Sequence, residues 1–286
     1  MTTQQKLRAL VDARRGLIVP GAFNALSARV VADMGFEAIY VTGAGVTNMW
    51  FGMPDQGFMG LTDIADHTAR IRDAVDVPLI VDADTGFGNA VNTYHTVRTL
   101  ERAGADCIQL EDQISPKRCG HFNGKDVIEA SEMIGKIKAA VDGRRSEGTL
   151  IMARTDAAAV HGFDAAVERA QAYAEAGADI LFVEAVTSVE HIRALPQRLK
   201  QPQLMNMVIG GKTPITDTDE LANMGFSIVL YANAALQGAV AGMQRALGVL
   251  QKDRNLQEDP LLVAPFSERQ RLVQKELWDS LEHKYK

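Results

Sequence analysis

Polar and charged residues of the kinds found in active sites recur in this chain directly after short apolar runs. They are Thr42 with Gly43, Asp82 with Asp84, Glu111 with Asp112, Arg154 with Asp156, Glu184, Asn206, and Tyr231 with Asn233. Any one of them could be a loop cap or a surface charge. Because so many runs end in the same way, we predict that these side chains converge on one site.

Three of these residues form an acidic cluster. Asp82 and Asp84, in VDADTGFGN, are two residues apart and point to the same side of an extended chain. With Glu111 nearby, two charges about 4 Å apart would repel by about 4 kcal/mol at an effective dielectric of about 20. A cation removes that repulsion, and oxygen ligands favour Mg²⁺, or Mn²⁺ in its place, with one direct carboxylate and several waters. The alternative is that the aspartates cap a tight turn before Gly86 and Gly88.

A long polar connection carries a cysteine among positive neighbours. Residues 113–127 span about fifteen positions, whereas roughly two to six are usual between a strand and a helix, so we predict a lid. Cys119 is flanked by Lys117, Arg118 and His121, and positive charge there lowers a thiol pKa. We predict that Cys119 is a nucleophile or a proton donor; the alternative is a partly buried loop thiol.

Apolar runs alternate with helical periodicity along the chain and predict the elements that position these residues. The eight candidate strands are Leu17–Pro20, Ala38–Thr42, Pro78–Asp82, Cys107–Glu111, Leu150–Arg154, Ile180–Glu184, Gln203–Asn206 and Ser227–Tyr231. The candidate helices between them include Ala25–Met34, Thr62–Ala74, Thr93–Ala103, Ile128–Ala140, Asp164–Ala176 and Val189–Leu199. Uniformly apolar strands suit a parallel sheet covered on both faces, so we predict a (β/α)8 TIM barrel, with an open doubly wound sheet as the alternative.

Two segments fall outside the alternation. Gln4–Ala13 precedes the first strand and is expected to close the bottom of the barrel. From about residue 251 the chain is charged and interrupted by proline, and helical periodicity returns at Glu268–Glu282. We predict a catalytic barrel over residues 1–250 and a helical extension over residues 251–286 that packs on a neighbouring subunit.

Composition excludes several classes of protein. The chain has 286 residues, of which 47% are hydrophobic and 23% charged, as in ordinary globular domains. The net charge of −6 argues against nucleic acid as a partner, and no apolar run is long enough for a membrane helix. Two cysteines are too few for a disulfide scaffold, and Cys107, inside a candidate strand, is predicted to be inert. We therefore predict a cytoplasmic protein.

These motifs together resemble the isocitrate lyase and phosphoenolpyruvate mutase superfamily over nearly the whole chain, and most of all its branch of 2,3-dimethylmalate lyase, petal death protein and methylisocitrate lyase. The matching segments are PGAFNALSARV, TGAG, PD, DADTGFGN, LEDQ, PKRCGH, ARTDA, VEA and NMVIGGKTP. The resemblance implies a (β/α)8 barrel with a domain-swapped C-terminal helix, a homotetramer built as a dimer of dimers, and a magnesium site.

The resemblance also implies roles for individual residues. Asp84 would bind magnesium most directly, with Asp82, Glu111 and Asp112 as candidates for its water shell. The catalytic set is Cys119, Arg154, Tyr40 and His121. The substrate-binding set is Thr42, Gly43, Ala44, Asp55, Lys117, Gly120, Arg154, Glu184 and Asn206.

The cysteine in PKRCGH points to the lyase branch, because the phosphonate enzymes of this superfamily carry a non-cysteine sequence there. We therefore expect a magnesium-dependent carbon–carbon lyase that cleaves a small 2-hydroxydicarboxylate, of the 2,3-dimethylmalate or methylisocitrate type, to a 2-oxo acid and a carboxylate. A thiol would protonate the enolate-like fragment that cleavage leaves.

Two departures from the lyase pattern bear on the substrate. Ile209 stands where related lyases carry a polar residue, and Ala232 stands where several have proline; both are expected to line the end of the pocket that accepts the leaving fragment. An oxaloacetate hydrolase or decarboxylase is the alternative activity, and phosphonopyruvate chemistry is a further one. The non-enzymatic alternative is a catalytically silent barrel that serves as a scaffold.

Overall fold

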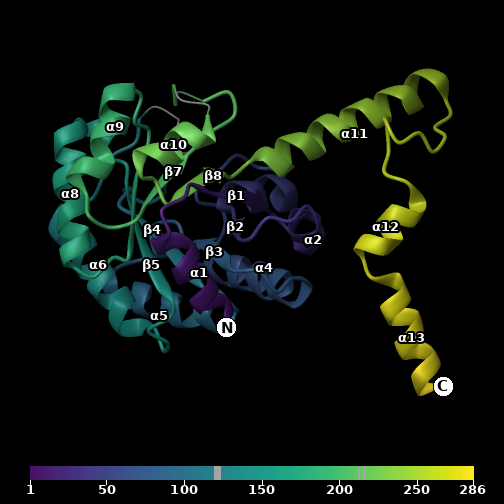
Figure 1. Cartoon of the computed structure of the whole chain (residues 1–286), viewed down its shortest axis with the longest axis horizontal. Coiled ribbons are helices and arrows are strands. Elements are labelled where there is room, and N and C mark those ends of the chain that lie inside the picture. The colour runs from purple at the N-terminus through teal and green to yellow at the C-terminus, as the bar shows by residue number, and fades with distance from the viewer. Residues whose placement is uncertain (119–123, 212, 215–216) are drawn as a thin grey trace.

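The computed structural model describes residues 1–118, 124–211, 213–214 and 217–286, and its eight strands close into one parallel barrel. The strands are β1 (Leu17–Ala22), β2 (Ile39–Val41), β3 (Leu79–Asp82), β4 (Cys107–Glu111), β5 (Leu150–Thr155), β6 (Ile180–Val183), β7 (Gln203–Asn206) and β8 (Ile228–Tyr231). Each strand pairs with its neighbour in sequence, and β1 pairs with β8 (Figure 1). The predicted (β/α)8 barrel is confirmed and the open-sheet alternative is wrong.

Helices pack around the barrel and confirm the predicted periodic segments. They are α2 (Ala25–Asp33), α4 (Leu61–Ala74), α5 (Ala90–Arg102), α6 (Ala130–Gly143), α8 (Phe163–Glu175), α9 (Val189–Arg198) and α10 (Thr218–Met224). Three short turns follow strand ends: α3 (Gly43–Val46) and the π-helical η1 (Thr47–Phe51) after β2, and α7 (Ala157–Val160) after β5. None of the described helices is long and apolar enough to cross a membrane.

Helix α1 (Thr3–Asp12) closes the amino end of the barrel, as predicted. Its N-terminus is fixed by Thr2 and Gln5, which cap each other's backbone N–H groups. Leu7 and Val11 are fully buried in the cluster that fills the barrel interior. With this end filled by apolar side chains, the opposite, carboxyl end is where polar side chains can gather.

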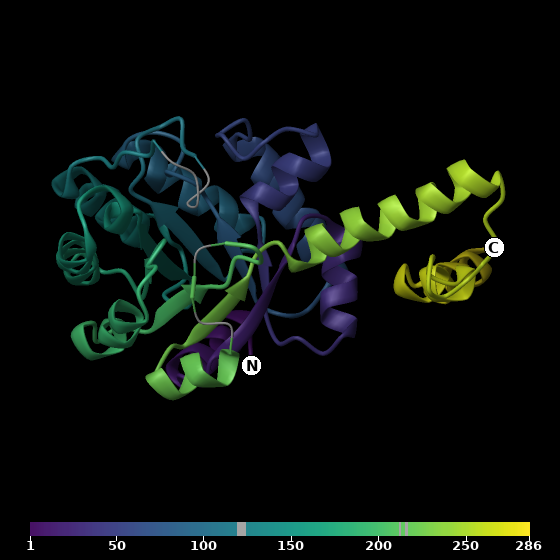
Figure 2. The same ribbon diagram turned by 90° about the horizontal axis from the view of Figure 1, so that it is seen from above.

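The end of the chain leaves the barrel. Helix α11 (Ala234–Asp253) starts at the barrel mouth and projects outward, and α12 (Phe266–Leu272) and α13 (Lys275–Tyr285) fold back beyond it (Figures 1 and 2). The expected single helix Glu268–Glu282 is wrong, because the backbone at Gln274 is left-handed (φ 57°) and separates the two. Arg271 of α12 is paired with Asp33 of α2 at 2.6 Å.

Candidate active site at the carboxyl end of the barrel

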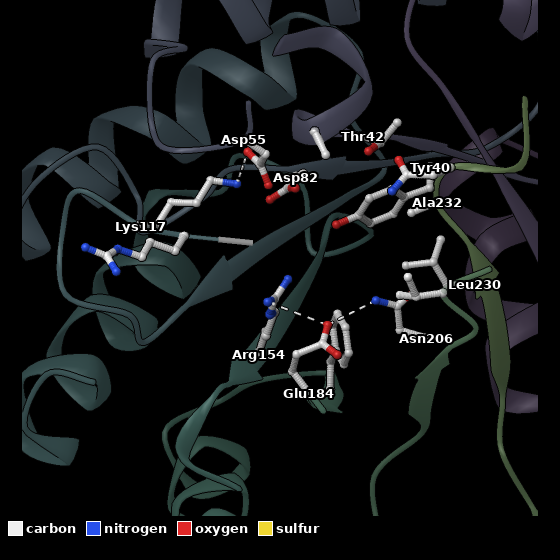
Figure 3. A pocket seen from close by; sticks show the side chains of 15 residues that line it. Tyr40, Thr42, Asp55, Asp82, Lys117, Arg154, Glu184, Asn206, Leu230 and Ala232 are labelled. Atoms are coloured by element: carbon white, nitrogen blue, oxygen red, sulfur yellow. Dashed lines mark hydrogen bonds and ion pairs between the residues drawn. The ribbon is translucent and has the colours of Figure 1, made fainter. Parts of the chain in front are cut away.

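A pocket opens at the carboxyl ends of the strands, where the fold predicts it. Its lining residues are Tyr40, Thr42, Ala44, Asp55, Asp82, Lys117, Arg118, Arg154, Phe182, Glu184, Asn206, Val208, Leu230, Ala232 and Asn233. Most of the predicted site residues are therefore brought together (Figure 3). Cys119, Gly120 and His121, which we also predicted, lie outside the described residues.

The side chain of Asp82 is fixed by backbone and side-chain donors. Its Oδ1 accepts from the Asp84 N–H (3.1 Å) and from Gln109 Nε2 (3.2 Å), and its Oδ2 accepts from the Gly43 N–H (3.3 Å). A β carbon on Gly43 would lie 3.0 Å from Asp82 Oδ2 and 3.4 Å from Asp84 Oδ1. The two aspartates thus converge beneath Gly43, where a larger residue would crowd them.

Asp84 and Asp55 share the ammonium group of Lys117. Lys117 Nζ lies 2.8 Å from Asp84 Oδ1 and 2.5 Å from Asp55 Oδ1, the latter contact drawn in Figure 3. Asp84 and Lys117 are buried and Asp55 is largely covered, and burial raises the pKa of Asp84 to about 7. Lys117, predicted to contact substrate and to act on the thiol, is thus engaged in the acidic cluster.

Arg154 lies among three carboxylates. Its Nε and Nη2 contact the two oxygens of Asp156 at 2.9 and 3.2 Å. Nε is 3.3 Å from Glu111, Nη2 is 3.5 Å from Glu184, and the side chain is only 11% exposed. This planar two-point contact with Asp156 fixes the orientation of the guanidinium. Asp156 was predicted to lie at the same strand end, but no role was predicted for it.

The far wall of the pocket combines an amide with a second carboxylate. Asn206 Nδ2 donates to Glu184 Oε2 (3.0 Å), and Glu184 Oε1 accepts from the Ala185 N–H (2.7 Å). The buried Asn206 Oδ1 has no hydrogen-bond partner in the described part of the chain. A buried polar atom of this kind needs a partner from a ligand or water.

Gln109 connects the predicted catalytic Tyr40 to the acidic cluster. The Tyr40 hydroxyl donates to Gln109 Oε1 (2.6 Å), and Gln109 Nε2 in turn donates to Asp82. Burial raises the pKa of Tyr40 well above its usual value, so the phenol stays protonated. We did not predict Gln109; the available signal was one polar residue inside the otherwise apolar strand Cys107–Glu111.

Asp112 faces the outside of the barrel, so its expected place in the water shell of a metal is wrong. It is fully buried, and its carboxylate accepts from the hydroxyls of Thr155 (2.7 Å) and Tyr173 (2.8 Å) and from the Asp156 N–H. Consecutive residues of a strand point to opposite faces. Glu111 therefore points inward and Asp112 outward.

The expectation for the substrate end of the pocket is only partly correct. Ala232 lines the pocket as predicted, and its carbonyl oxygen packs so closely on Gly21 that a β carbon there would be 1.8 Å away. Ile209 is 50% exposed, and its neighbour Val208 lines the pocket instead. The wall near Asn206 is thus apolar at Val208, Leu230 and Ala232.

The carboxylates of Asp82, Asp84 and Glu111 suit a cation that is bound largely through water. Among the described residues, no three His, Cys, Asp or Glu side chains form a group that would hold a metal ion directly. Glu111 Oε1 is buried and has no hydrogen-bond partner in the same residues. Hard cations such as Mg²⁺ keep several waters. Asp82, Asp84 and Glu111 therefore fit an ion bound through one carboxylate and bridged by water to the others.

A family model described as phosphoenolpyruvate phosphomutase matches residues 7–250. The chain belongs to this family. It is 41% identical over 285 residues to 2,3-dimethylmalate lyase of Eubacterium barkeri, covering 100% of this chain and 99% of that protein. It is 47% identical over 241 residues to 2-methylisocitrate lyase of Aeropyrum pernix, covering 84% of this chain and 77% of that protein. The resemblance inferred from the motifs is confirmed.

Solved structures of the superfamily share the fold of this family member. A crystal structure of 2,3-dimethylmalate lyase superposes with a TM-score of 0.93 at 33% identity, covering 100% of this chain and 96% of that one. Oxaloacetate acetylhydrolase bound to 3,3-difluorooxalacetate superposes with a TM-score of 0.91 at 33% identity, covering 99% of this chain and 96% of that one. Phosphonopyruvate hydrolase bound to oxalate and Mg²⁺ superposes with a TM-score of 0.88 at 30% identity, covering 100% of this chain and 99% of that one.

The raised pKa of Asp84 predicts how metal affinity depends on pH. With a pKa of about 7 the buried carboxyl is protonated at lower pH, and an ion bound there would have to displace the proton. Mg²⁺ affinity should therefore rise by up to about tenfold per pH unit as the pH approaches 7, and level off above it. Calorimetric titration with Mg²⁺ across this range tests this. An affinity that does not change with pH contradicts it.

Proposed function

We propose that this chain is a magnesium-dependent carbon–carbon lyase that cleaves a small 2-hydroxydicarboxylate of the 2,3-dimethylmalate type, or the related tricarboxylate methylisocitrate, to a 2-oxo acid and a carboxylate. The observation that carries the proposal is the opposition of two groups across one pocket. Asp82 and Asp84 lie on one side, and Arg154, held by Asp156, lies on the other; Glu111, 3.3 Å from Arg154 Nε, links the two. The two most similar relatives described above are lyases by name.

Asp84 would bind Mg²⁺, or Mn²⁺ in its place, most directly, with Asp82 and Glu111 in its water shell. When bound, such an ion stabilises negative charge that develops on an oxygen of the substrate. The burial of all three carboxylates strengthens their attraction for a cation. Lys117 supplies positive charge to the same cluster from the side of Asp55.

The other pocket residues would bind and orient the substrate. Arg154 presents a fixed guanidinium for one carboxylate, and the turn at Thr42, Gly43 and Ala44 would receive the same end of the molecule. Asn206 and Glu184 would contact the leaving fragment, beside the apolar surface at Val208 and Ala232. Alkyl groups fit such a surface better than a third carboxylate would.

Cys119 would supply the proton that ends the reaction. When the bond to the next carbon breaks, the substrate hydroxyl becomes the 2-oxo group and releases a proton, which restores the thiol of Cys119 at the end of the cycle. The electron pair of the broken bond stays on the carbon beside the departing carboxylate. The thiol of Cys119 gives its proton to that carbon, and Tyr40 and His121 would support the proton transfer. The hydrogen bond from the Tyr40 hydroxyl to Gln109 would hold the phenol in place for this role.

A panel of substrates tests the reaction. The full-length protein with Mg²⁺ is incubated with 2-hydroxy and 2-oxo dicarboxylates, and pyruvate, glyoxylate and oxalate are each quantified. A lyase releases pyruvate or glyoxylate with an equal amount of a second carboxylate. Failure to cleave any 2-hydroxydicarboxylate would contradict the proposal.

Oxaloacetate hydrolysis is the second candidate, favoured by the similarity to oxaloacetate acetylhydrolase. In the same panel it would release oxalate and acetate from oxaloacetate, whereas a decarboxylase would release pyruvate and carbon dioxide. Release of phosphate from phosphonopyruvate would indicate phosphonate chemistry. A silent scaffold would show no Mg²⁺-dependent thermal stabilisation by oxalate or pyruvate.

We further propose that residues 251–286 pack on a neighbouring subunit in a homotetramer. The tail and α11 expose large apolar side chains, among them Leu247, Phe266 and Trp278, the last 63% exposed. Contiguous exposed apolar residues mark interaction surfaces. Trp278→Glu should therefore lower the molecular mass of the assembly measured by light scattering. Lys284→Glu, a charge change near the same end of the chain, should not. A Trp278→Glu variant that remains a tetramer, or a parent protein that is a monomer, contradicts the proposal.

The position of Cys107 is in keeping with the expected reducing cytoplasm, which stays a prediction. The side chain is fully buried in the barrel interior, and burial raises the pKa of its thiol well above the usual value. Its predicted inert role is supported, because the reactive form of cysteine is the thiolate.

A further inference from the structure

Lys125 is a buried lysine that follows residues 119–123, and it contacts the same carboxylate that holds Arg154. Its Nζ lies 2.7 Å from Asp156 Oδ1, and its side chain is 3% exposed. Arg154 Nη2 donates to this same oxygen at 3.2 Å. Asp156 is fully buried, so it is a carboxylate shared by two cations away from solvent.

Asp156 is the carboxylate that acts most directly on Arg154. Asp156, Glu111 and Glu184 lie within 3.5 Å of its guanidinium, at 2.9, 3.3 and 3.5 Å. Asp156 makes the two shortest of these contacts, and a buried carboxylate offsets the charge of the cation beside it. Lys125 compensates Asp156, which leaves more of the positive charge of Arg154 for an incoming carboxylate.

The shared carboxylate is itself fixed from behind. The Asp156 N–H donates to Asp112 Oδ1 at 2.9 Å, and the Thr155 hydroxyl donates to the other oxygen of Asp112 at 2.7 Å. Arg169 lies 3.3 Å from the same carboxylate and donates to the carbonyl of Ile128, which follows Lys125 by three residues. Asp156 and the chain beside Lys125 are thus anchored to one buried acid.

We propose that Lys125 is a positioning residue for substrate binding, which acts through Asp156 to orient Arg154 and to hold the chain on the C-terminal side of Cys119. The inference rests on the proposed function, in which Arg154 binds a substrate carboxylate. Lys117, on the N-terminal side of Cys119, is tied in the same way to Asp84. The two flanks of the cysteine segment are therefore attached to the two opposed halves of the pocket.

Binding of oxalate to the full-length protein, saturated with Mg²⁺, tests the proposal by calorimetry. Lys125→Met should weaken oxalate binding by about tenfold, the lower end of the effect expected when a residue that supports a binding group is lost. Lys125→Gln, a smaller change that keeps a polar group, should weaken it as well. Lys138→Met, which removes an exposed lysine of α6, is the matched control and should leave the oxalate Kd unchanged.

A double-mutant cycle shows whether Lys125 acts through Asp156. In a protein that already carries Asp156→Asn, Lys125→Met should weaken oxalate binding no further. If Asp156→Asn does not fold, Lys125→Met is compared in a protein that carries Arg154→Lys instead. The affinity for Mg²⁺ without oxalate should stay the same in Lys125→Met, which a general loss of structure would not allow. The proposal is overturned if Lys125→Met weakens oxalate binding equally in the presence and in the absence of Asp156. It is also overturned if Lys125→Met leaves the oxalate Kd unchanged.

The readout separates this proposal from the proposed function. Oxalate binding requires the pocket but no turnover. A parent protein that binds oxalate and cleaves no 2-hydroxydicarboxylate would contradict the lyase assignment, and the cycle on Lys125 would still decide the positioning role.

Discussion

Replacing Cys119 by serine is expected to lower turnover of the cleaved substrate by about 10²–10⁴-fold, the range that a positioned general acid contributes. The hydroxyl of serine has the size to replace the thiol but is a far weaker acid, so the carbon left by bond cleavage would not be protonated at a useful rate. Binding of Mg²⁺ and of a product oxo-acid should be retained, since neither needs the thiol proton. Steady-state kinetics with parallel calorimetry measure both.

The other cysteine provides the control for that experiment. Cys107→Ala removes a thiol that is fully buried in the barrel interior, far along the strand from the site. Turnover should stay within about twofold of the parent value, although a small cavity lowers stability slightly. If Cys119→Ser turned over substrate at the parent rate, Cys119 would not be the proton donor.

Replacing Arg154 by lysine is expected to lower kcat/KM by about 10²–10³-fold, as for the loss of one aligned donor in an active site. Lysine keeps the positive charge among Glu111, Asp156 and Glu184, so the protein should still fold. A single ammonium cannot contact both oxygens of Asp156 and also offer a planar pair of donors to a substrate carboxylate. Kinetics on the best substrate of the panel measure the effect.

A similar substitution at the other end of the barrel separates this effect from general damage. Arg144 is paired with Asp179 at 3.1 Å and is also partly buried, but it lies near the amino ends of the strands. Arg144→Lys should leave kcat/KM within about twofold of the parent value. A loss in both variants, or in neither, would show that Arg154 has no special role in binding.

The affinity for Mg²⁺ alone distinguishes the two halves of the pocket. Arg154→Lys should leave it largely unchanged, because Asp82 and Asp84 are held by Gly43, Gln109 and Lys117. Glu111, which would contact the ion through water, lies 3.3 Å from Arg154, and lysine keeps a positive charge beside it. Metal affinity that fell with substrate affinity would show that the acidic cluster depends on the guanidinium.

The barrel itself was predictable from the sequence because its signal is local and repeated. Several strands are short apolar runs after a helix and a glycine turn, as at Gly35, Gly104, Gly177 and Gly225. The strands Cys107–Glu111 and Gln203–Asn206 were predicted to the residue. Burial on both faces of a parallel sheet demands such runs, so no knowledge of distant contacts was needed. The break at Gln274 was missed, because one left-handed residue leaves helical periodicity almost unchanged.

The acidic cluster and Arg154 were also predictable from the sequence, because position at a strand end implies position at the barrel mouth. The role of Cys119 stays a prediction. Which atoms meet was decided only by the tertiary structure. Lys117 pairs with Asp55 and Asp84, 62 and 33 positions away, and Lys125 pairs with Asp156, 31 positions away. Asp156 in turn holds Arg154. Alternation along one strand turned Glu111 into the pocket and Asp112 away from it. Side-chain direction and charge pairing depend on which strands become neighbours, and spacing along the chain does not contain that information.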